Sequence, residues 1–541
     1  MKRSLFHVLT GAILVLGFSV AAPTWAQAPE TIVCPDNAAL CLTLQAQTIF
    51  GLSPSLGPSD SGTGKSASLS ANSVTFNSGT VHFLLGAISN DSDAVTLNSV
   101  FIHGGAVQNE AYGGLVSLSP GSGSASNNSV TVDGATAAVN GVTGGKVWGA
   151  VGDATVLNNS VDVRNGAAGF ANGGAAHSSG GDATTSGNTV TISDDGVVAN
   201  HIAGGEAISE AGTATASSNH IIIHDGGEVI TSNPAVLANV YGGFADGFVI
   251  ASLASDNTVT IGDQSTADAE IFGGHAHSED DSTATASGNS VIVEGGGTAT
   301  GGDIYGGYAS NNDAATATAS GNSVGISTGG TADNDVIGGH ARANDGAATA
   351  SNNAVTINGG EVGGEVFGGQ AETSGDGAAT VSGSTVEISD GGTVGEVVFG
   401  ARAISASSAA VTGSTITISD GTVAFLVSGG FAEGGENATV SGSSVTISDS
   451  MVGAGAVSGS VIGGVAMSDD GIAAVSDNRV EVSGSTVNDG PVFGGAARSD
   501  EGTATASNNS AEIGDGTVVR AVMGGGAGSD DFGTTTASGN T

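Results

Sequence analysis

Basic side chains are scarce in this sequence. Its 541 residues include 10 Lys and Arg against 52 Asp and Glu, which gives a formal net charge of −42 at neutral pH. Such a chain repels the phosphate backbone of nucleic acids and the surface of anionic membranes. We therefore expect no nucleic-acid partner.

Aromatic and proline residues are also few, at 4% aromatic and 8 Pro. A chain with so few rings cannot build a thick core, so any core must consist of Val, Ile and Ala. Glycine, in contrast, accounts for 93 residues. It follows no three-residue period, which excludes collagen. Low proline and a sustained strand pattern argue against disorder.

The acidic residues gather in turns, as in Asp194-Asp195, Glu279-Asp280-Asp281 and Asp469-Asp470. Acidic turns keep a long β surface soluble and prevent sideways aggregation. The alternative is weak Ca²⁺ binding, because clustered carboxylates suit a hard cation. Apart from that possibility we expect no cofactor.

Only two cysteines are present, Cys34 and Cys41, and both lie in a segment that precedes the repeats, residues 27–66. In an exported protein two nearby cysteines can close a small disulfide loop. We expect this segment to be a leader that caps the first coil of the repeat region, since the exposed end of a repeat stack must be covered.

Residues 1–26 have the pattern of a secretory signal peptide. Lys2 and Arg3 provide the positive start, an apolar run follows, and Thr24 and Ala26 are the small residues expected before a cleavage site. This pattern predicts export from the cytoplasm.

The rest of the chain, residues 67–541, is organised around one repeated motif, Ser-Gly-Asn-Thr-Val-Thr-Ile at residues 186–192. The Asn of this motif, or a Ser in its place, occurs sixteen times in all, with a mean spacing of about 31 residues. A fixed period of this length is typical of a stacked repeat architecture. The last copy starts at residues 536–541 and stops within the motif, so we expect the native protein to be longer.

The residues two and four positions after the anchor are almost always Val or Ile, with a polar residue between them. This alternation predicts a half-buried strand whose β-branched side chains face inward. The anchor and its two apolar columns are represented by Asn188, Val190, Ile192, Asn289, Val291, Val293, Asn353, Val355 and Ile357.

Two further segments complete each repeat. One contains a Gly pair, as in Ile-Phe-Gly-Gly-His-Ala at 271–276, where Gly suggests a bend or close backbone packing. The other reads Ala-Thr-Ala-Ser, as at 284–287. Three short strands per repeat cannot bury an apolar face alone, whereas stacked repeats can. The sequence thus predicts an all-β solenoid, a parallel β-helix of about 15 coils; stacked antiparallel hairpins are the alternative.

The anchor Asn allows two structural interpretations. Stacked amides can form a hydrogen-bonded ladder along the axis. Alternatively, the Asn is only a turn residue, in left-handed or Asx-turn conformation.

No catalytic or metal-binding motif stands out. His275 and His277 share one face of a strand, and His340 occupies the same column as His275, but no set of ligands is built around them, so we expect surface histidines. The aromatic residues before the Gly pairs, such as Phe272 and Tyr305, are expected to pack within the stack, with a sugar-binding strip as the alternative.

The Asn-Ser-Val-Thr-Ile, Val-Phe-Gly-Gly-x-Ala and Thr-Ala-Ser-Gly-Asn units behind a signal peptide resemble the Gly-rich passenger regions of bacterial autotransporters. The resemblance covers about residues 67–541 and implies a surface-exposed parallel β-helix stalk, often adhesive. It also implies secretion through a C-terminal outer-membrane barrel, which would be a partner of this region.

We therefore expect a secreted or surface-exposed stalk or adhesin without catalytic activity, located at the cell surface, in the outer membrane or outside the cell. Its ligands would lie on host, matrix or sister-cell surfaces. Two alternatives remain: an exported polysaccharide-active β-helix enzyme, and a structural protein of a surface matrix or layer.

Overall fold

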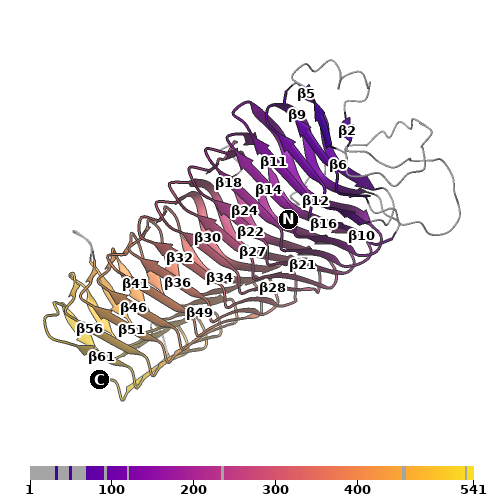
Figure 1. Cartoon of the computed structure of the whole chain (residues 1–541). Coiled ribbons are helices and arrows are strands. Elements are labelled where there is room, and N and C mark those ends of the chain that lie inside the picture. The colour runs from indigo at the N-terminus through magenta and orange to yellow at the C-terminus, as the bar shows by residue number, and fades with distance from the viewer. Residues whose placement is uncertain are drawn as a thin grey trace.

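The computed structural model describes residues 31–34, 48–50, 69–78, 80–89, 94–117, 121–232, 237–453, 458–529 and 533–541. These residues form an all-β parallel solenoid of about 14 turns with a period of 31 residues. Figure 1 shows the coils as one long stack that runs from the indigo to the yellow end of the chain. The predicted β-solenoid is confirmed. The alternative of antiparallel hairpins is wrong, because the strands of neighbouring coils pair in parallel.

One coil in the middle of the stack illustrates the unit. It begins with β28 (Thr283–Ser287), turns at Asn289 into β29 (Ser290–Val293), and continues into the long strand β30 (Thr298–Asn311). The chain has then completed one turn, and β31 (Ala317–Ser320) pairs with β28 in parallel register. Each strand therefore pairs with its own equivalent one coil away.

The strands that follow the anchor form a sheet of 16 parallel strands, which we call the valine sheet. Its members are β1 (Thr31–Cys34), β4 (Ser73–Phe76), β8 (Ser99–Ile102), β11 (Ser129–Asp133), β14 (Ser160–Arg164), β18 (Thr189–Ser193), β22 (His220–Ile223), β26 (Thr258–Ile261), β29, β32 (Ser323–Ser327), β36 (Ala354–Asn358), β41 (Thr385–Ser389), β46 (Thr415–Ser419), β51 (Ser444–Ser448), β56 (Arg479–Ser483) and β61 (Ser510–Ile513).

The strands that precede the anchor form a second sheet of 16 strands, the alanine sheet. Its members are β3 (Leu69–Ser70), β7 (Ala94–Thr96), β10 (Gly123–Ser126), β13 (Ala154–Leu157), β17 (Ala183–Ser186), β21 (Thr213–Ser217), β25 (Ala251–Ser255), β28, β31, β35 (Ala348–Ser351), β40 (Ala378–Ser382), β45 (Ser408–Thr412), β50 (Asn437–Ser441), β55 (Ile472–Ser476), β60 (Thr503–Ser507) and β64 (Thr534–Ser538).

The third face carries the Gly pairs, and we call it the glycine sheet. In some coils it is one long strand, and in others it is divided into two or three short ones. Its members are β2 (Thr48–Phe50), β5 (Thr80–Val81), β6 (Phe83–Ser89), β9 (Gly105–Ser117), β12 (Ala137–Ala150), β15 (Ala167–Ala168), β16 (Ala171–Ser178), β19 (Val197–Val198), β20 (Ile202–Ser209), β23 (Glu228–Val229), β24 (Ala238–Gly247), β27 (Thr266–Ser278), β30, β33 (Thr331–Ala332), β34 (Val336–Ala343), β37 (Glu361–Val362), β38 (Val366–Phe367), β39 (Gln370–Thr373), β42 (Thr393–Val394), β43 (Val398–Phe399), β44 (Arg402–Ser405), β47 (Thr422–Val423), β48 (Leu426–Ser428), β49 (Phe431–Gly434), β52 (Met451–Val452), β53 (Ser460–Ile462), β54 (Val465–Ser468), β57 (Thr486–Val487), β58 (Pro491–Phe493), β59 (Ala496–Ser499), β62 (Ala521–Met523) and β63 (Gly526–Ser529).

The interior of the solenoid holds two separate apolar cores. The larger lies between the valine sheet and the first half of the glycine sheet, where Val291 and Val293 share one cluster with Ile304. The smaller lies between the alanine sheet and the second half of the glycine sheet, where Ala284 and Ala309 belong to the other cluster. Each buried Val or Ile contributes roughly 1.5–3 kcal/mol.

A wall of Asn side chains and Gly backbones divides the two cores. The Asn289 side chain is fully buried, and a Cβ added to Gly274 would lie 2.3 Å from its Oδ1. A Cβ added to Gly273 would lie 2.3 Å from the carbonyl oxygen of Gly306 one coil away. Both approaches are closer than any side chain allows, so the bend in the glycine sheet requires glycine at these positions.

Two strands from the predicted leader continue the stack. Strand β1 pairs with β4 and β2 pairs with β6, both in parallel. Cys41 and the predicted signal peptide 1–26 lie outside the described residues, so the disulfide and the division of the chain at residues 26 and 66 stay predictions. Within the described ranges no helix is long and apolar enough to cross a membrane.

Candidate functional site

The predicted anchor residues are internal. Asn188, Asn289 and Asn353 are fully buried, and the Val and Ile columns that follow them, Val190, Ile192, Val291, Val293, Val355 and Ile357, are buried too. The residue of the turn that has the left-handed backbone conformation is the one before the Asn, as at Gly288 with a φ of 65°. The Asn itself is not in that conformation. The Asn side chain is thereby free to point inward.

The anchor amides form a ladder along the axis. Asn289 Nδ2 donates to Asn322 Oδ1 at 3.0 Å and to the carbonyl oxygen of Ala254 at 3.0 Å. Asn289 Oδ1 accepts from the backbone N and from Nδ2 of Asn257, both at 3.0 Å. Every polar atom of the buried amide is therefore satisfied, and each rung also fixes the backbone of the coil beside it.

The ladder is interrupted where Ser replaces Asn. Ser384 Oγ is buried and has no hydrogen-bond partner. Ser414 Oγ and Ser443 Oγ lie 3.0 Å apart, and the backbone N of Ser443 donates to Asn478 Oδ1 at 2.9 Å, where the amide ladder resumes. All three Ser sites are preceded in the alanine sheet by a buried Val three residues earlier: Val381, Val411 and Val440. Asn478 is also preceded by a buried Val, Val475, so a Val at this position accompanies both Ser and Asn anchors.

The outer face of the bend carries an aromatic strip. Because the glycine sheet bends, the residues before and after each Gly pair both lie outside the two cores and approach each other. The rings of Phe272 and Tyr305 stack with centroids 5.0 Å apart and planes 6° apart. The rings of Phe272 and His275 lie 5.0 Å apart on the same strand. Phe272 and Phe367 are buried, so their faces serve packing within the stack.

A second column on the outer face contains His275, Tyr308 and His340. The rings of His275 and Tyr308 are 4.8 Å apart, and those of Tyr308 and His340 are 5.0 Å apart, both edge to face. The ring nitrogens of both histidines are buried and lack hydrogen-bond partners. The expectation of surface histidines is wrong for His340, which is buried, and His275 is half-buried with both ring nitrogens covered by its neighbours.

Burial has a clear electrostatic effect on His275. Burial, with a smaller contribution from the neighbouring His277, lowers the pKa of the imidazole to about 3. The ring is therefore neutral at physiological pH, with one N–H donor and one acceptor nitrogen.

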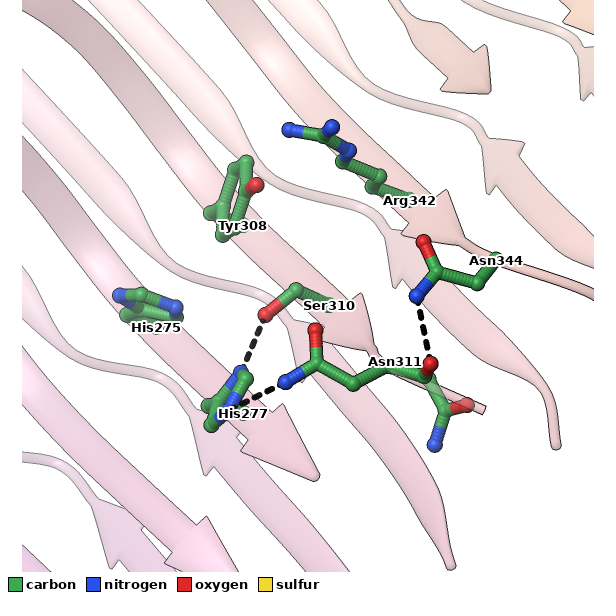
Figure 2. A pocket seen from close by; sticks show the side chains of 8 residues that line it. His275, His277, Tyr308, Ser310, Asn311, Arg342 and Asn344 are labelled. Atoms are coloured by element: carbon green, nitrogen blue, oxygen red, sulfur yellow. Dashed lines mark hydrogen bonds between the residues drawn. The ribbon is translucent and has the colours of Figure 1, made fainter. Parts of the chain in front are cut away.

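A pocket of about 340 Å³ opens beside this column, over strands β27, β30 and β34. His275 and Tyr308 line it together with Arg342 of the next coil (Figure 2). The other lining residues are His277, Ser310, Asn311, Asn312 and Asn344.

Hydrogen bonds hold the polar rim of the pocket. His277 Nδ1 lies 2.8 Å from Ser310 Oγ, and Asn312 Nδ2 lies 3.3 Å from His277 Nε2. Asn344 Nδ2 donates to the carbonyl oxygen of Asn312 at 2.5 Å. The rim is thus built from three successive coils, and its hydroxyl and amide groups face a common space (Figure 2).

Carboxylates lie near the pocket but do not line it. The carboxylate of Glu372 is held by Gln370 Nε2 at 2.6 Å and lies 3.8 Å from His340 Nε2, and its neighbour His340 lowers its pKa to about 2. Burial, with Glu279 and Glu206 adding to it, raises the pKa of Asp246 to about 7, and its Oδ1 lacks a partner.

A row of acids flanks the other side of the aromatic strip. Asp303 Oδ1 accepts from the backbone N of Asp335 at 3.3 Å, and Asp335 Oδ1 accepts from the backbone N of Glu365 at 2.8 Å. Burial raises the pKa of Asp335, and so do its neighbours Asp303 and Glu396. These carboxylates link coils through the backbone, which is a structural role.

The acidic turns contain one group that could supply three ligand atoms to an ion among the described residues. His224, Asp225 and Asp263 place such atoms within 4.8 Å of one another. The two Asp are exposed, and His224 Nδ1 already lies 2.6 Å from Asp225 Oδ2. The group is a weak basis for a metal site, since exposed acidic turns are common throughout this chain.

No protein-family model, curated protein or solved structure matches this chain. The site is therefore interpreted from its own residues. The sequence indicated the aromatic and histidine columns, but not the pocket, because Asn312 and Asn344 follow the ends of β30 and β34, in turns whose length varies from coil to coil. One available signal was Arg342 itself, because basic side chains are scarce in this chain.

Proposed function

We propose that this chain is the passenger region of an autotransporter-type surface protein, and that it acts as a stalk and adhesin without catalysing a reaction. The observation that carries the proposal is the regular parallel stack of about 14 turns. Such a stack makes a long, stiff rod whose two cores and amide ladder are repeated in coil after coil. A rod of this kind holds a binding surface away from the membrane that carries it.

The predicted signal peptide supports export, and the acidic surface supports solubility outside the cell. The ligand would be a molecule of a host, matrix or sister-cell surface, and export would use an outer-membrane translocator barrel. Against a glycosidase role, none of the residues that line the pocket is Asp or Glu, whereas glycoside hydrolysis generally uses two carboxylates.

Surface display is tested on intact cells of the organism that produces the protein. An antibody raised against the purified solenoid should label unpermeabilised cells, and brief protease treatment should remove the label without releasing cytoplasmic proteins. Labelling only after permeabilisation would contradict the proposal. Light scattering of the purified chain separates the adhesin from a layer protein, because a layer protein should assemble into large particles and an adhesin should stay a single rod.

A further inference from the structure

The pocket beside Tyr308 is unusual in this chain for its charge. The chain carries a net charge of −42, yet the pocket is lined by Arg342, two histidines and neutral polar residues. The walls therefore favour a ligand that is neutral or negative, even though the surface of the molecule as a whole repels anions. That long-range repulsion is screened over roughly 8 Å at physiological salt. The residues that line the pocket therefore determine which charge a bound ligand can carry.

Among the six arginines of the described residues, Arg342, Arg402 and Arg520 form no ion pair, whereas the other three do. Arg164, Arg479 and Arg498 each pair with an acid two residues away in their own strand or just beyond it, at 3.0, 2.9 and 3.5 Å. The positions two residues from Arg342 hold His340 and Asn344 instead.

The nearest acid in register with Arg342 is Glu372 on the next coil. That carboxylate is already engaged by Gln370 and lies beside His340. In the described part of the chain Arg342 forms no ion pair, and its guanidinium borders the pocket beside Tyr308. A guanidinium in this position suits a carboxylate brought by a ligand, since the two groups pair in a planar, bidentate manner.

The remaining groups suit the rest of a sugar ring. The half-buried ring of Tyr308 provides an apolar surface. The amides of Asn312 and Asn344 and the hydroxyl of Ser310 border the pocket with donors and acceptors. The volume of about 340 Å³ is at the lower end of the range for small-molecule sites.

We propose that this pocket binds one acidic sugar residue, a pyranose that carries a carboxylate, with Arg342 pairing with the carboxylate and Asn312, Asn344 and Ser310 hydrogen-bonding to the hydroxyls. The proposal rests on the adhesive role proposed above and specifies which ligand the adhesin binds. It names uronic-acid-type sugars of surface polysaccharides as the ligand class. Because ligand binding is measured on the purified chain, its failure is distinguishable from a failure of surface display.

The test is saturation-transfer NMR and calorimetric titration of the purified chain with methyl glucuronide and, as the neutral counterpart, methyl glucoside. We expect the glucuronide to bind at least tenfold more tightly than the glucoside, and to bind more weakly as salt rises. Arg342→Gln should weaken glucuronide binding about tenfold or more, because one charge-assisted contact is lost. Glucoside binding should change little.

The matched control is Arg498→Gln. Arg498 occupies the same outward column several coils further on, but its guanidinium pairs with Asp500 at 3.5 Å. This variant should bind the glucuronide as the unchanged chain does, and circular dichroism should show the same β spectrum for all three proteins. Equal binding of the two sugars, binding of neither, or unaltered binding by Arg342→Gln would each overturn the proposal.

Discussion

Gly274 lies directly against the side-chain amide of Asn289, so closely that a Cβ on Gly274 would come within 2.3 Å of Asn289 Oδ1. The two residues face each other across the interior, one from the bend of the glycine sheet and one from the turn between the other two sheets. Their contact repeats in neighbouring coils, as between Gly307 and Asn322, and it separates the two cores. Four predictions follow from this arrangement and from the charged groups outside it.

The first prediction concerns the bend. Gly274→Ala should lower the free energy of unfolding by about 3 kcal/mol, because the added methyl group must displace the Asn289 amide or the strand. Gly325→Ala is the control, since a Cβ there would meet no atom within 4 Å. Urea denaturation followed by circular dichroism measures both variants. Equal stability of the two would show that the bend tolerates side chains.

The second prediction concerns a rung of the amide ladder. Asn289→Ala removes the acceptor of the Asn257 backbone N and of Asn257 Nδ2. Two buried donors are left without partners, so we expect a loss of about 3 kcal/mol. Hydrogen exchange should speed up most in the coils on either side, because stability in a stacked repeat is local. Asn358→Ala, at an exposed position, should have no such effect.

The third prediction concerns the gap in the ladder. Ser384→Asn should stabilise the chain by about 1 kcal/mol, because the new Oδ1 can accept from the Asn353 amide. Asn478 and Val475 coexist in another coil with both side chains buried, so an Asn also fits beside Val381. A melting temperature that falls in this variant would show that the Val column leaves no room for an amide.

The strands of this fold could be predicted from the sequence, but the contacts across its interior could not. The Val and Ile columns predicted the strands and their inward faces, since alternation within a strand needs no knowledge of the rest of the molecule. The same pattern could not tell which columns meet across the interior. The contact of Gly274 with Asn289 depends on the angle of the bend, and that angle is a property of the whole coil.

The candidate site was less accessible from sequence for the same reason. His275 and His277 were expected on a shared strand face, which follows from their spacing of two residues. The burial of His275 depends on Phe272 and Tyr308, and these reach it only because the bend brings the two sides of a Gly pair together on the outside. When only the alternation of residues along the strand is considered, His275 is expected to be exposed.

The fourth prediction concerns pH. Asp246 has a pKa of about 7, raised from 3.8 mainly by burial. The folded state therefore binds more protons than the unfolded state between about pH 4 and pH 7, so the free energy of unfolding falls as pH rises through that window. Glu206 and Glu279 add to the effect, and His277 lies in register on the next coil.

Asp246→Asn removes this penalty. The variant should be more stable than the unchanged chain by on the order of 2 kcal/mol at about pH 8 and nearly equal to it at about pH 4. Urea denaturation at a series of pH values measures the difference. A constant difference across the series would show that Asp246 is ionised in the folded chain at all these values.

The parallel register between equivalent strands also has a consequence for how the gene can change. Serine lies on serine, valine on valine and asparagine on asparagine, as at Ser290 and Ser323 or Val291 and Val324. A recombination event that adds or removes one whole unit of about 31 residues joins two surfaces that already match. The solenoid can thus be lengthened or shortened by whole coils over generations while the remaining coils keep their register. An insertion of any other length must form a loop outside the stack.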